Sequence, residues 1–516
     1  MDAMGYASPT ATRITRAGAA CFLLLVLAPM FASALDGDSL IETLRLSLPT
    51  GRKGALLLNS LSLAALTAAL TTLLGALTGI AMLTPGRLPT RLKLLFPALF
   101  LVPPHIHSLA WSRLFHWTAS LFGLPLANGL PAAAWVQTMH LLPLGAGLAA
   151  LALAHLDRAG IETGLTMAEP GAVWRSIVLP QATPMLLAGV GLAFVLSLVD
   201  YGIPSLFQVN TYAMEIFAEF SASGQAARPL ALSLALLVPS GAVLAATHRG
   251  LRKVLLAPSR KTEGAFLPPW PVAWRPLRLL GSAIALVQAA VPLTVLVLGL
   301  SKGTTGGSTV LGSLGELVYS LAVSAAAALL ALLPALGYAR VMQRGGSLRW
   351  LLPLVALAIP APLTGAGLIA LFRGTPLMGS DLLPALASAC RFMPAAALIL
   401  AAALSHLPED RLEAGLVFAG NESRFARKIF LPLLAPGLAA ALLLVFALAL
   451  GELGATLMVC PPGRGTVTMK IYNYLHAGTF DAVAGLCLAT LGLVLGGMLF
   501  AQRMAFGDKI GRRPSC

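Results

Sequence analysis

Two acidic residues in long apolar stretches are the first candidates for chemistry in this chain. Asp200 and Glu452 each lie within or at the end of such a stretch, and each is followed two residues later by a glycine, Gly202 or Gly454. A carboxylate in apolar surroundings is costly unless it faces a cavity, a cation or a hydrogen-bonding partner. We therefore expect these four residues beside a pathway rather than against lipid. For each acid, we favour pairing with a nearby group or binding of water over direct contact with a solute.

Other kinds of chemistry find little support in the sequence. His105 and His107 follow two prolines, but side chains two residues apart do not share a helix face, so we predict no metal site. The chain contains no Gly-Lys dipeptide and hence no P-loop. Its Ser, His and Asp residues fit no hydrolase signature, and its five cysteines form no Cys-x-x-Cys pair. We predict no catalytic residue, no metal ligand and no cofactor bound by the chain itself.

The composition indicates which elements must position the acids. Of the 516 residues, 57% are hydrophobic and 11% are charged, whereas soluble domains carry about 25% charged residues. The apolar blocks lack the alternation of barrel strands, and only helices satisfy their own backbone in lipid. The sequence therefore predicts an all-α polytopic membrane protein embedded in a lipid bilayer. The net charge of +15 does not indicate nucleic-acid binding, because no basic run is interleaved with aromatic residues.

Stretches of spanning length, near 20 residues or longer, predict about twelve transmembrane helices. The first six are expected near residues 17–35, 55–83, 94–113, 133–153, 183–205 and 228–247. The other six are expected near residues 277–299, 314–339, 350–372, 384–405, 434–459 and 482–502. We divide the chain into a first half, a basic linker and a second half, at residues 1–247, 248–276 and 277–516. An even number of spans gives both halves the same orientation, so the repeat is parallel.

The distribution of basic residues predicts the orientation. With the N-terminus inside, 25 Lys and Arg fall on the inner side and seven in outer loops, which favours both termini in the cytoplasm. Arg13 and Arg16 precede an apolar stretch that ends in Ala32-Ser33-Ala34 and resembles a cleavable signal peptide. That stretch is longer than the usual apolar region of about 7–15 residues, so we favour retention of the first span.

The halves share one recognisable segment, at residues 162–180 and 413–432. Each segment ends in Leu-Pro, and Pro180 and Pro432 are 252 residues apart. Twenty residues beyond each proline comes the acid described above. Both segments are predicted on the inner face, each with a short helix before the Leu-Pro turn.

The pattern of these segments resembles the EAA loop of binding-protein-dependent ABC importer permeases of the type I class. The second copy fits this loop at full length, with Glu413, Ala414, Gly415, Ala419, Ile429, Leu431 and Pro432. The first copy is degenerate and one residue shorter, with Glu162, Gly164, Ala168, Ile177, Leu179 and Pro180. Small residues in these loops are expected to let a partner surface approach the backbone closely.

The resemblance extends to the sequences 451–456 and 461–463, which look like those of fused permeases that serve ferric-iron importers. It implies the permease subunit of an ATP-driven importer in a bacterial inner membrane. Two copies of a cytoplasmic ATPase subunit would bind ATP and dock at the two loops. A periplasmic binding protein would deliver solute to outer loops near residues 36–54, 206–227 and 460–481. Ferric iron is the expected solute, with thiamine, phosphonate and other small solutes left open.

Two other classes of protein fit the sequence less well. A secondary transporter of the major facilitator type would also have six plus six spans, but the loop at 84–93 lacks the acid of that family's signature. A membrane-embedded enzyme would need clustered acids or histidines within the spans. Two lone charges, Glu316 and Arg391, are expected to pair with each other or to reach toward the bilayer surface.

Overall fold

The structure is a computed structural model that describes residues 9–36, 45, 48–83, 96–256, 267–302, 306–344, 346–476 and 480–510. Its described part contains helices and connecting turns without a strand, so the predicted all-α class is confirmed. The loop at 84–93 and residues 257–266 of the predicted linker lie outside the described residues.

The helices of the predicted first half alternate long apolar elements with short ones. They are α1 (Pro9–Leu35), α3 (Gly51–Leu83), η1 (Phe96–Leu101), α5 (Pro104–Phe122), α6 (Gly129–Ala154), α7 (Arg158–Met167), α8 (Pro170–Val173), η2 (Trp174–Val178), α9 (Leu179–Leu198), α10 (Gly202–Leu206), α11 (Tyr212–Ser223) and α12 (Ala227–Leu255). The short 3₁₀ turn η3 (Val272–Trp274) precedes the next long helix.

The predicted second half repeats this order. Its helices are α13 (Arg275–Lys302), α14 (Gly306–Leu311), α15 (Leu314–Gln343), α16 (Ser347–Ala356), α17 (Ala361–Phe372), α18 (Leu382–Ser405), α19 (Glu409–Phe418), α20 (Glu422–Phe425), η4 (Ala426–Phe430), α21 (Leu431–Leu450), α22 (Thr456–Val459), α23 (Val467–His476) and α24 (Phe480–Ile510).

Ten helices of the described part are long and apolar enough to cross a membrane, and the bent pair α16–α17 makes an eleventh candidate. The expected span at 94–113 is the exception to the predicted twelve. Its described residues form η1 and then α5, which is not among the candidate spans. Pro103 lies between these two elements and Pro104 begins α5, and Pro360 lies in the 88° bend between α16 and α17. Prolines cannot continue the helical hydrogen-bond pattern, so both halves are broken at comparable places.

The first long helix of each half packs on the other half. Helix α1 packs against α15 and α17, and α13 packs against α3. Glycines permit both crossings: a Cβ on Gly337 would lie 2.7 Å from the Cα of Gly18, and one on Gly281 would lie 2.4 Å from the carbonyl oxygen of Leu77. Small residues allow such close approach between membrane helices. The two halves therefore form one interlocked bundle, in which α1 is an integral member.

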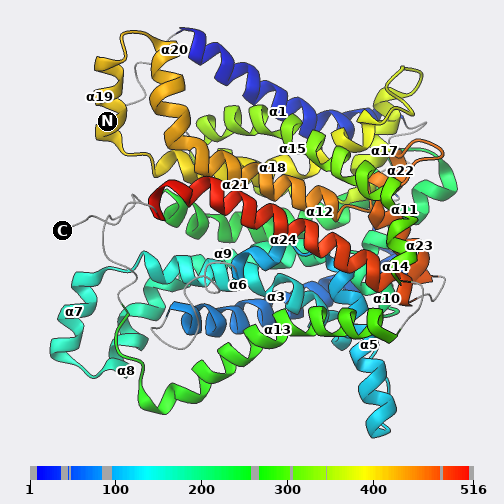
Figure 1. Ribbon diagram of the computed structural model, residues 1–516, viewed down its shortest axis with the longest axis horizontal. Helices are drawn as coiled ribbons and strands as arrows, with labels where there is room; N and C mark the ends of the chain where they lie inside the picture. Colours follow the sequence, from blue (N-terminus) through cyan, green and yellow to red (C-terminus); the bar gives the residue numbers. More distant parts are fainter. Residues whose placement is uncertain are drawn as a thin grey trace.

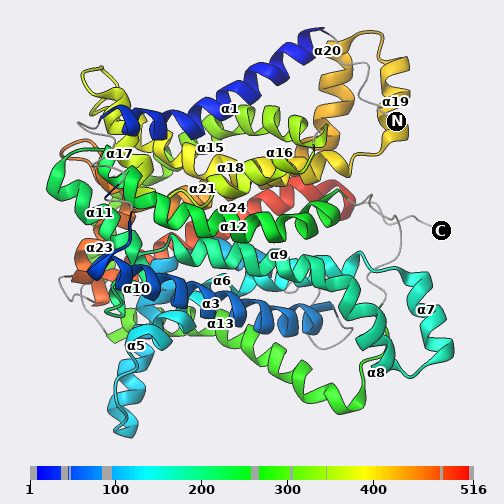
Figure 2. The ribbon, with the colours of Figure 1, turned by 180° about the vertical axis from the view of Figure 1, so that it is seen from behind.

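The short helices gather at the two ends of this bundle. At one end lie α7 and α8 together with α19 and α20, and α1 begins and α24 ends there as well (Figures 1 and 2). At the opposite end lie α10, α11, α17, α22 and α23. The two copies of the repeated segment therefore share one face of the protein, as a parallel repeat requires.

Candidate functional site

The repeated segments fold into closely matching units, here called the first EAA segment (residues 158–180) and the second EAA segment (residues 409–432). Each unit has a ten-residue helix, a four-residue helix and a five-residue π turn, followed by a twenty-residue helix. The single residue that the first copy lacks falls between its two short helices. The sequence repeat thus corresponds to a structural repeat at every step.

The π turns precede the Leu-Pro pairs. The N–H of Leu179 donates to the carbonyl of Trp174, and the N–H of Leu431 donates to the carbonyl of Ala426. Pro180 and Pro432 follow directly and have no N–H to continue the usual pattern. A wider turn at this point accommodates the missing donor, and such turns are frequent at functional sites.

The motif glycines pack inside their own segments. A Cβ on Gly164 would lie 2.6 Å from Cδ1 of Ile177, and one on Gly415 would lie 2.8 Å from Cδ1 of Ile429. We expected both glycines to admit a partner's backbone, but each is covered by the motif isoleucine. The spacing of Gly and Ile in the motif therefore holds the short helix against the π turn.

Other motif residues point outward. Glu162, Ala168, Leu179 and Pro180 of the first segment, and Glu413, Ala414, Leu431 and Pro432 of the second, are exposed, whereas Ala419 is buried. Met167 and Phe418 end the two ten-residue helices and are 83% and 84% exposed. Large apolar side chains at equivalent positions, both uncovered, mark surfaces that another protein could cover.

Aromatic rings connect the linker region to the first EAA segment. Trp174 is buried, and its ring meets that of Trp270 edge to face with centroids 4.9 Å apart. Trp270 packs on Trp274 in turn, at 5.5 Å. The indole N–H of Trp270 donates to the carbonyl of Trp274 over 2.7 Å. These three tryptophans are called the tryptophan cluster below.

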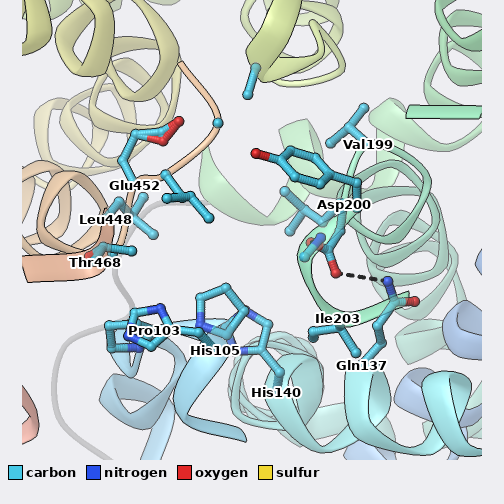
Figure 3. Close-up of a pocket in the computed structure, with 18 of the residues that line it drawn as sticks. Pro103, His105, Gln137, His140, Val199, Asp200, Ile203, Leu448, Glu452 and Thr468 are labelled. Carbon is cyan, nitrogen blue, oxygen red and sulfur yellow. Dashed lines mark hydrogen bonds between the residues drawn. The ribbon is translucent and has the colours of Figure 1, made fainter. Parts of the chain in front are cut away.

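A cavity of ≈ 220 Å³ lies between the two halves. Its polar lining comes from α5, α6 and the turn after α9 on one side, and from α18, the turn after α21 and α23 on the other. Asp200 and Glu452 both line it, on opposite sides (Figure 3). Each acid follows the end of its long helix, α9 or α21, by two residues.

Asp200 is held by neutral donors. Its Oδ2 accepts from Nε2 of Gln137 over 2.9 Å, and its Oδ1 accepts from the backbone N–H of Gly202 over 3.0 Å. The amide oxygen of Gln137 accepts from the hydroxyls of Thr67 and Ser197, over 3.1 and 2.5 Å. Gln137 is thus fixed with its donor end toward the acid.

Glu452 is held by a charged donor. Its Oε1 accepts from Nη1 of Arg391 over 2.6 Å and from the backbone N–H of Ala455 over 2.7 Å. The expected pairing of Arg391 with Glu316 is wrong, because Glu316 pairs with Nζ of Lys470 over 2.6 Å. The structure therefore brings Arg391 to the cavity, where the sequence interpretation gave it no role.

The two predicted glycines have different neighbours. Gly202 donates to Asp200 as described, whereas Gly454 packs between Ala361 of its own half and Tyr201 of the first half. A Cβ on Gly454 would lie 3.0 Å from the hydroxyl of Tyr201 and 2.6 Å from Cβ of Ala361. Gly454 therefore allows Tyr201, which also lines the cavity, to cross to the second half.

Three histidines lie together on the first-half side of the cavity. His105 and His140 line it, and the rings of His107 and His140 have centroids 5.6 Å apart. Nε2 of His105 and Nδ1 of His140 are buried without a hydrogen-bond partner among the described residues. No group of three His, Cys, Asp or Glu residues in the described part could hold a metal ion.

Comparison with known proteins identifies the family. The family of binding-protein-dependent transport system inner membrane components matches residues 329–503. A putative 2-aminoethylphosphonate transport system permease protein of Salmonella typhimurium is 28% identical over 195 residues, 37% of this chain and 74% of that protein. An Fe(3+)-transport system permease protein of Haemophilus influenzae is 24% identical over 365 residues, 67% of this chain and 71% of that protein.

A probable molybdenum ABC transporter permease protein of Haloferax volcanii is 28% identical over 252 residues, 45% of this chain and 91% of that protein. The family match over residues 329–503 and these relatives together support a type I ABC importer permease. No solved structure matches it at a significant level.

Sequence reasoning missed several residues that this permease places at the cavity, above all Gln137, His140 and Tyr201. A signal for one of them exists in the repeat. The sequence His140-Leu-Leu-Pro143 matches Arg391-Phe-Met-Pro394 at a spacing of 251, within one residue of the spacing that links the EAA segments. Extending the repeat toward the N-terminus would have paired His140 with Arg391. Gln137 and Tyr201 carry no comparable signal, because only folding brings them to the cavity.

Proposed function

We propose that this chain is the membrane-spanning subunit of an ATP-driven importer, with two copies of a separate ATPase subunit docked on its EAA segments. The support is the pair of equivalent segments on one face, each with an uncovered apolar side chain at the end of its ten-residue helix, Met167 or Phe418. The chain has no P-loop, so ATP would be bound by the partners and no cofactor by the permease. That face would then be cytoplasmic, in a bacterial inner membrane, with both termini on the same side.

The cavity supports a pathway between the two halves. Its lining is drawn from both halves, and the helices at its edges belong to the matched repeats. Closure of two ATPase subunits would rock the halves through the EAA segments and expose the cavity alternately to each side. A periplasmic binding protein would deliver solute at the opposite face, where α10, α11, α22 and α23 lie.

The charges of the cavity favour a cation as solute, and ferric iron remains the best candidate. Asp200 and Glu452 are the acids among the lining residues, and Arg391 is their one strong base. Arg391 is bound to Glu452, so an anion entering the cavity would meet the carboxylate of Asp200 without a free strong base to balance it. This is the observation that favours a metal cation over a phosphonate or molybdate.

Reconstitution tests the proposal. The chain is co-expressed with the ATPase and binding-protein genes that neighbour its own and is assembled in liposomes. Uptake of radioactive ferric iron is compared with that of molybdate and 2-aminoethylphosphonate. We expect ATP-dependent uptake of iron and no ATP hydrolysis by the chain alone. Uptake driven by an ion gradient without an ATPase would favour a secondary transporter, and uptake of an oxyanion alone would overturn the choice of a cation.

A further inference from the structure

Helix α5 leaves the bundle part-way along its length. All of its buried residues lie between Ile106 and Trp111, and none from Ser112 to Phe122 is buried. The buried part packs against α6, α10 and α13. The rest projects from the side of the bundle beside α13, near the end at which α10 and α23 lie, and runs across the direction of the long helices (Figures 1 and 2). A helix with this direction lies along a bilayer surface and does not cross the bilayer.

The equivalent helix of the second half has no such extension. Both helices follow the proline that breaks their half, Pro103 or Pro360, but α17 has twelve residues and α5 has nineteen. The added residues 116–122, about two turns, end in a regular cap. Gly123 adopts a φ of 63°, and its N–H donates to the carbonyl of Ala119. The extension is therefore a completed helix that the fold shared by the halves does not require.

The projecting part of α5 has a polar stripe beside an apolar one. Residues three and four apart share a helix face, and each stripe follows that spacing. The polar stripe is Arg113, His116 and Ser120, and the apolar stripe is Leu114, Trp117 and Leu121. No acidic residue occurs in α5. A helix with Trp, Phe and Leu on one side and basic or polar residues on the other is typical of the membrane interface.

The protein leaves the end of the apolar stripe uncovered. Leu121 is 76% exposed and Phe122 is 68% exposed. Leu124 and Leu126, in the loop that leads back to α6, are exposed as well. A contiguous apolar surface of this kind marks a site that a lipid or another protein covers.

Two polar side chains fit a position at the bilayer surface. Thr118 lies on the apolar side, but its hydroxyl donates to the carbonyls of Leu114 and Phe115 over 3.0 and 3.1 Å, so its donor is satisfied within the helix. The guanidinium of Arg113 lies 4.7 Å from the ring centroid of Phe480, the first residue of the candidate span in α24. The polar stripe is therefore held at the level where a membrane-spanning helix begins.

We propose that residues 112–126 are a surface anchor that lies in the bilayer interface at the end of the bundle opposite the EAA segments. The apolar stripe faces the acyl chains, and the polar stripe faces water. The partner is lipid, because α5 projects sideways from the bundle and does not extend beyond the end of it, where a protein that delivers solute would bind. Tryptophan is enriched at this depth of a membrane. The inference requires a membrane protein but no particular solute.

Lipid photo-crosslinking tests this contact on the chain alone. The purified chain is reconstituted into vesicles of phosphatidylethanolamine and phosphatidylglycerol that contain a phospholipid with a diazirine in its acyl chain. Mass spectrometry then maps the lipid adducts. We expect adducts on the apolar stripe and few on the polar stripe. Adducts absent from residues 112–126, or equal on both stripes, would overturn the proposal.

Hydroxyl-radical oxidation of the same vesicles separates lipid from a protein partner. A side chain within the acyl chains is shielded from the radical, so we expect Leu121 and Phe122 to be oxidised less in vesicles than in the chain unfolded by denaturant. Oxidation as strong as in the unfolded chain would show that the apolar stripe faces water, as a surface for another protein would, and would overturn the anchor.

Two neighbouring side chains provide a matched pair of variants. Ser120 and Leu121 are both exposed, so contacts within the protein predict the same small effect for a glutamate at either position. A carboxylate among acyl chains is costly. Leu121→Glu should therefore lower the yield of adducts in residues 112–126 at least about fivefold, whereas Ser120→Glu should stay within about twofold of the parent. Equal yields for the two variants would contradict the proposal.

A neutral variant keeps the test informative if Leu121→Glu disturbs insertion. Leu121→Ser should lower the yield about two- to threefold. Adducts on Leu293 of α13, which is 50% exposed, report reconstitution and should match the parent. A parent-like yield at residues 112–126 in both Leu121 variants, with Leu293 labelled normally, would overturn the anchor. No ATPase, binding protein or solute is present, so this result does not depend on the proposed transport function.

Discussion

The two EAA segments have the same backbone conformation but differ in the side-chain contacts that stabilise them. In the first, Trp174 is buried in the tryptophan cluster, and the guanidinium of Arg175 lies 5.7 Å from the ring centroid of Trp274. In the second, α20 and η4 contain no buried residue among those described. Phe425, the counterpart of Trp174 in character, makes a tilted ring contact with Phe430 at 6.4 Å.

The segment that matches the motif less well is the one with the buried aromatic contact. The second segment matches the EAA pattern at full length, yet it has no buried aromatic cluster. Gly415 packs on Ile429 within the segment, and the guanidinium of Arg340 on α15 lies 4.8 Å from the ring centroid of Phe430. The first is one residue short, yet it is supported by the chain that leads into α13. A single connection between the halves can support only one of two equivalent segments. We infer that the first segment is held in place before a partner binds, and that the second depends on its own packing and on the partner.

The largest effect is expected from a bulky residue at Gly415. A Cβ there would meet Ile429 at 2.8 Å and the ring of Phe425 at 3.1 Å, so Gly415→Leu must push the short helix away from the π turn. We expect uptake and ATPase co-purification to fall at least about tenfold while the chain stays in the membrane. The matched variant Gly164→Leu should be milder, because beyond the mobile Cδ1 of Ile177 the next atoms, both on Val173, lie at 3.4 and 3.6 Å. Equal losses would argue against the idea that support differs between the segments.

The next largest effect concerns the buried indole of the first segment. Trp174→Ala removes a fully buried aromatic side chain, which typically costs about 3–5 kcal/mol. Phe425→Ala removes a half-buried ring and should cost about 1 kcal/mol. Thermal unfolding of the purified chain in detergent compares the two. A Phe425→Ala variant as unstable as Trp174→Ala would contradict the inference that the two segments differ in how they are stabilised.

A smaller effect is expected from the linker side of the same contact. Trp270 is half-buried, so Trp270→Ala should destabilise by about 1–2 kcal/mol, close to the value of an aromatic pair plus part of its burial. Protease nicking near α7 and α8 should increase, with nicking near α19 and α20 unchanged. Trp270→Phe, which keeps a ring at this place, serves as the control. Increased cleavage at both segments would show that the cluster stabilises the whole bundle rather than one segment.

Much of this architecture could be predicted because it depends on local pattern. The membrane-spanning helices can be predicted from the length of the apolar stretches. The two EAA segments can be predicted because similar sequences that end in Leu-Pro recur 252 residues apart. The single span predicted at 94–113 is wrong, because Pro103 and Pro104 interrupt the helix despite its apolar content. The pairings of Arg391 with Glu452 and of Glu316 with Lys470 span 61 and 154 residues. Such partners are chosen by packing between helices, which no local pattern records.

The smallest expected effect distinguishes the exposed acids of the two segments. Glu162 forms an exposed ion pair with Arg158 one turn earlier, over 2.8 Å. Such pairs contribute about 0.3–0.5 kcal/mol, so Glu162→Ala should barely change thermal unfolding. Because the tryptophan cluster holds this segment, its affinity for the ATPase subunit should fall by less than about threefold. Glu413→Ala should likewise leave unfolding unchanged, but it should weaken ATPase binding more, since the second segment lacks that support. Titration of the ATPase subunit onto each variant measures both affinities, and a greater loss for Glu162→Ala would reverse the ranking.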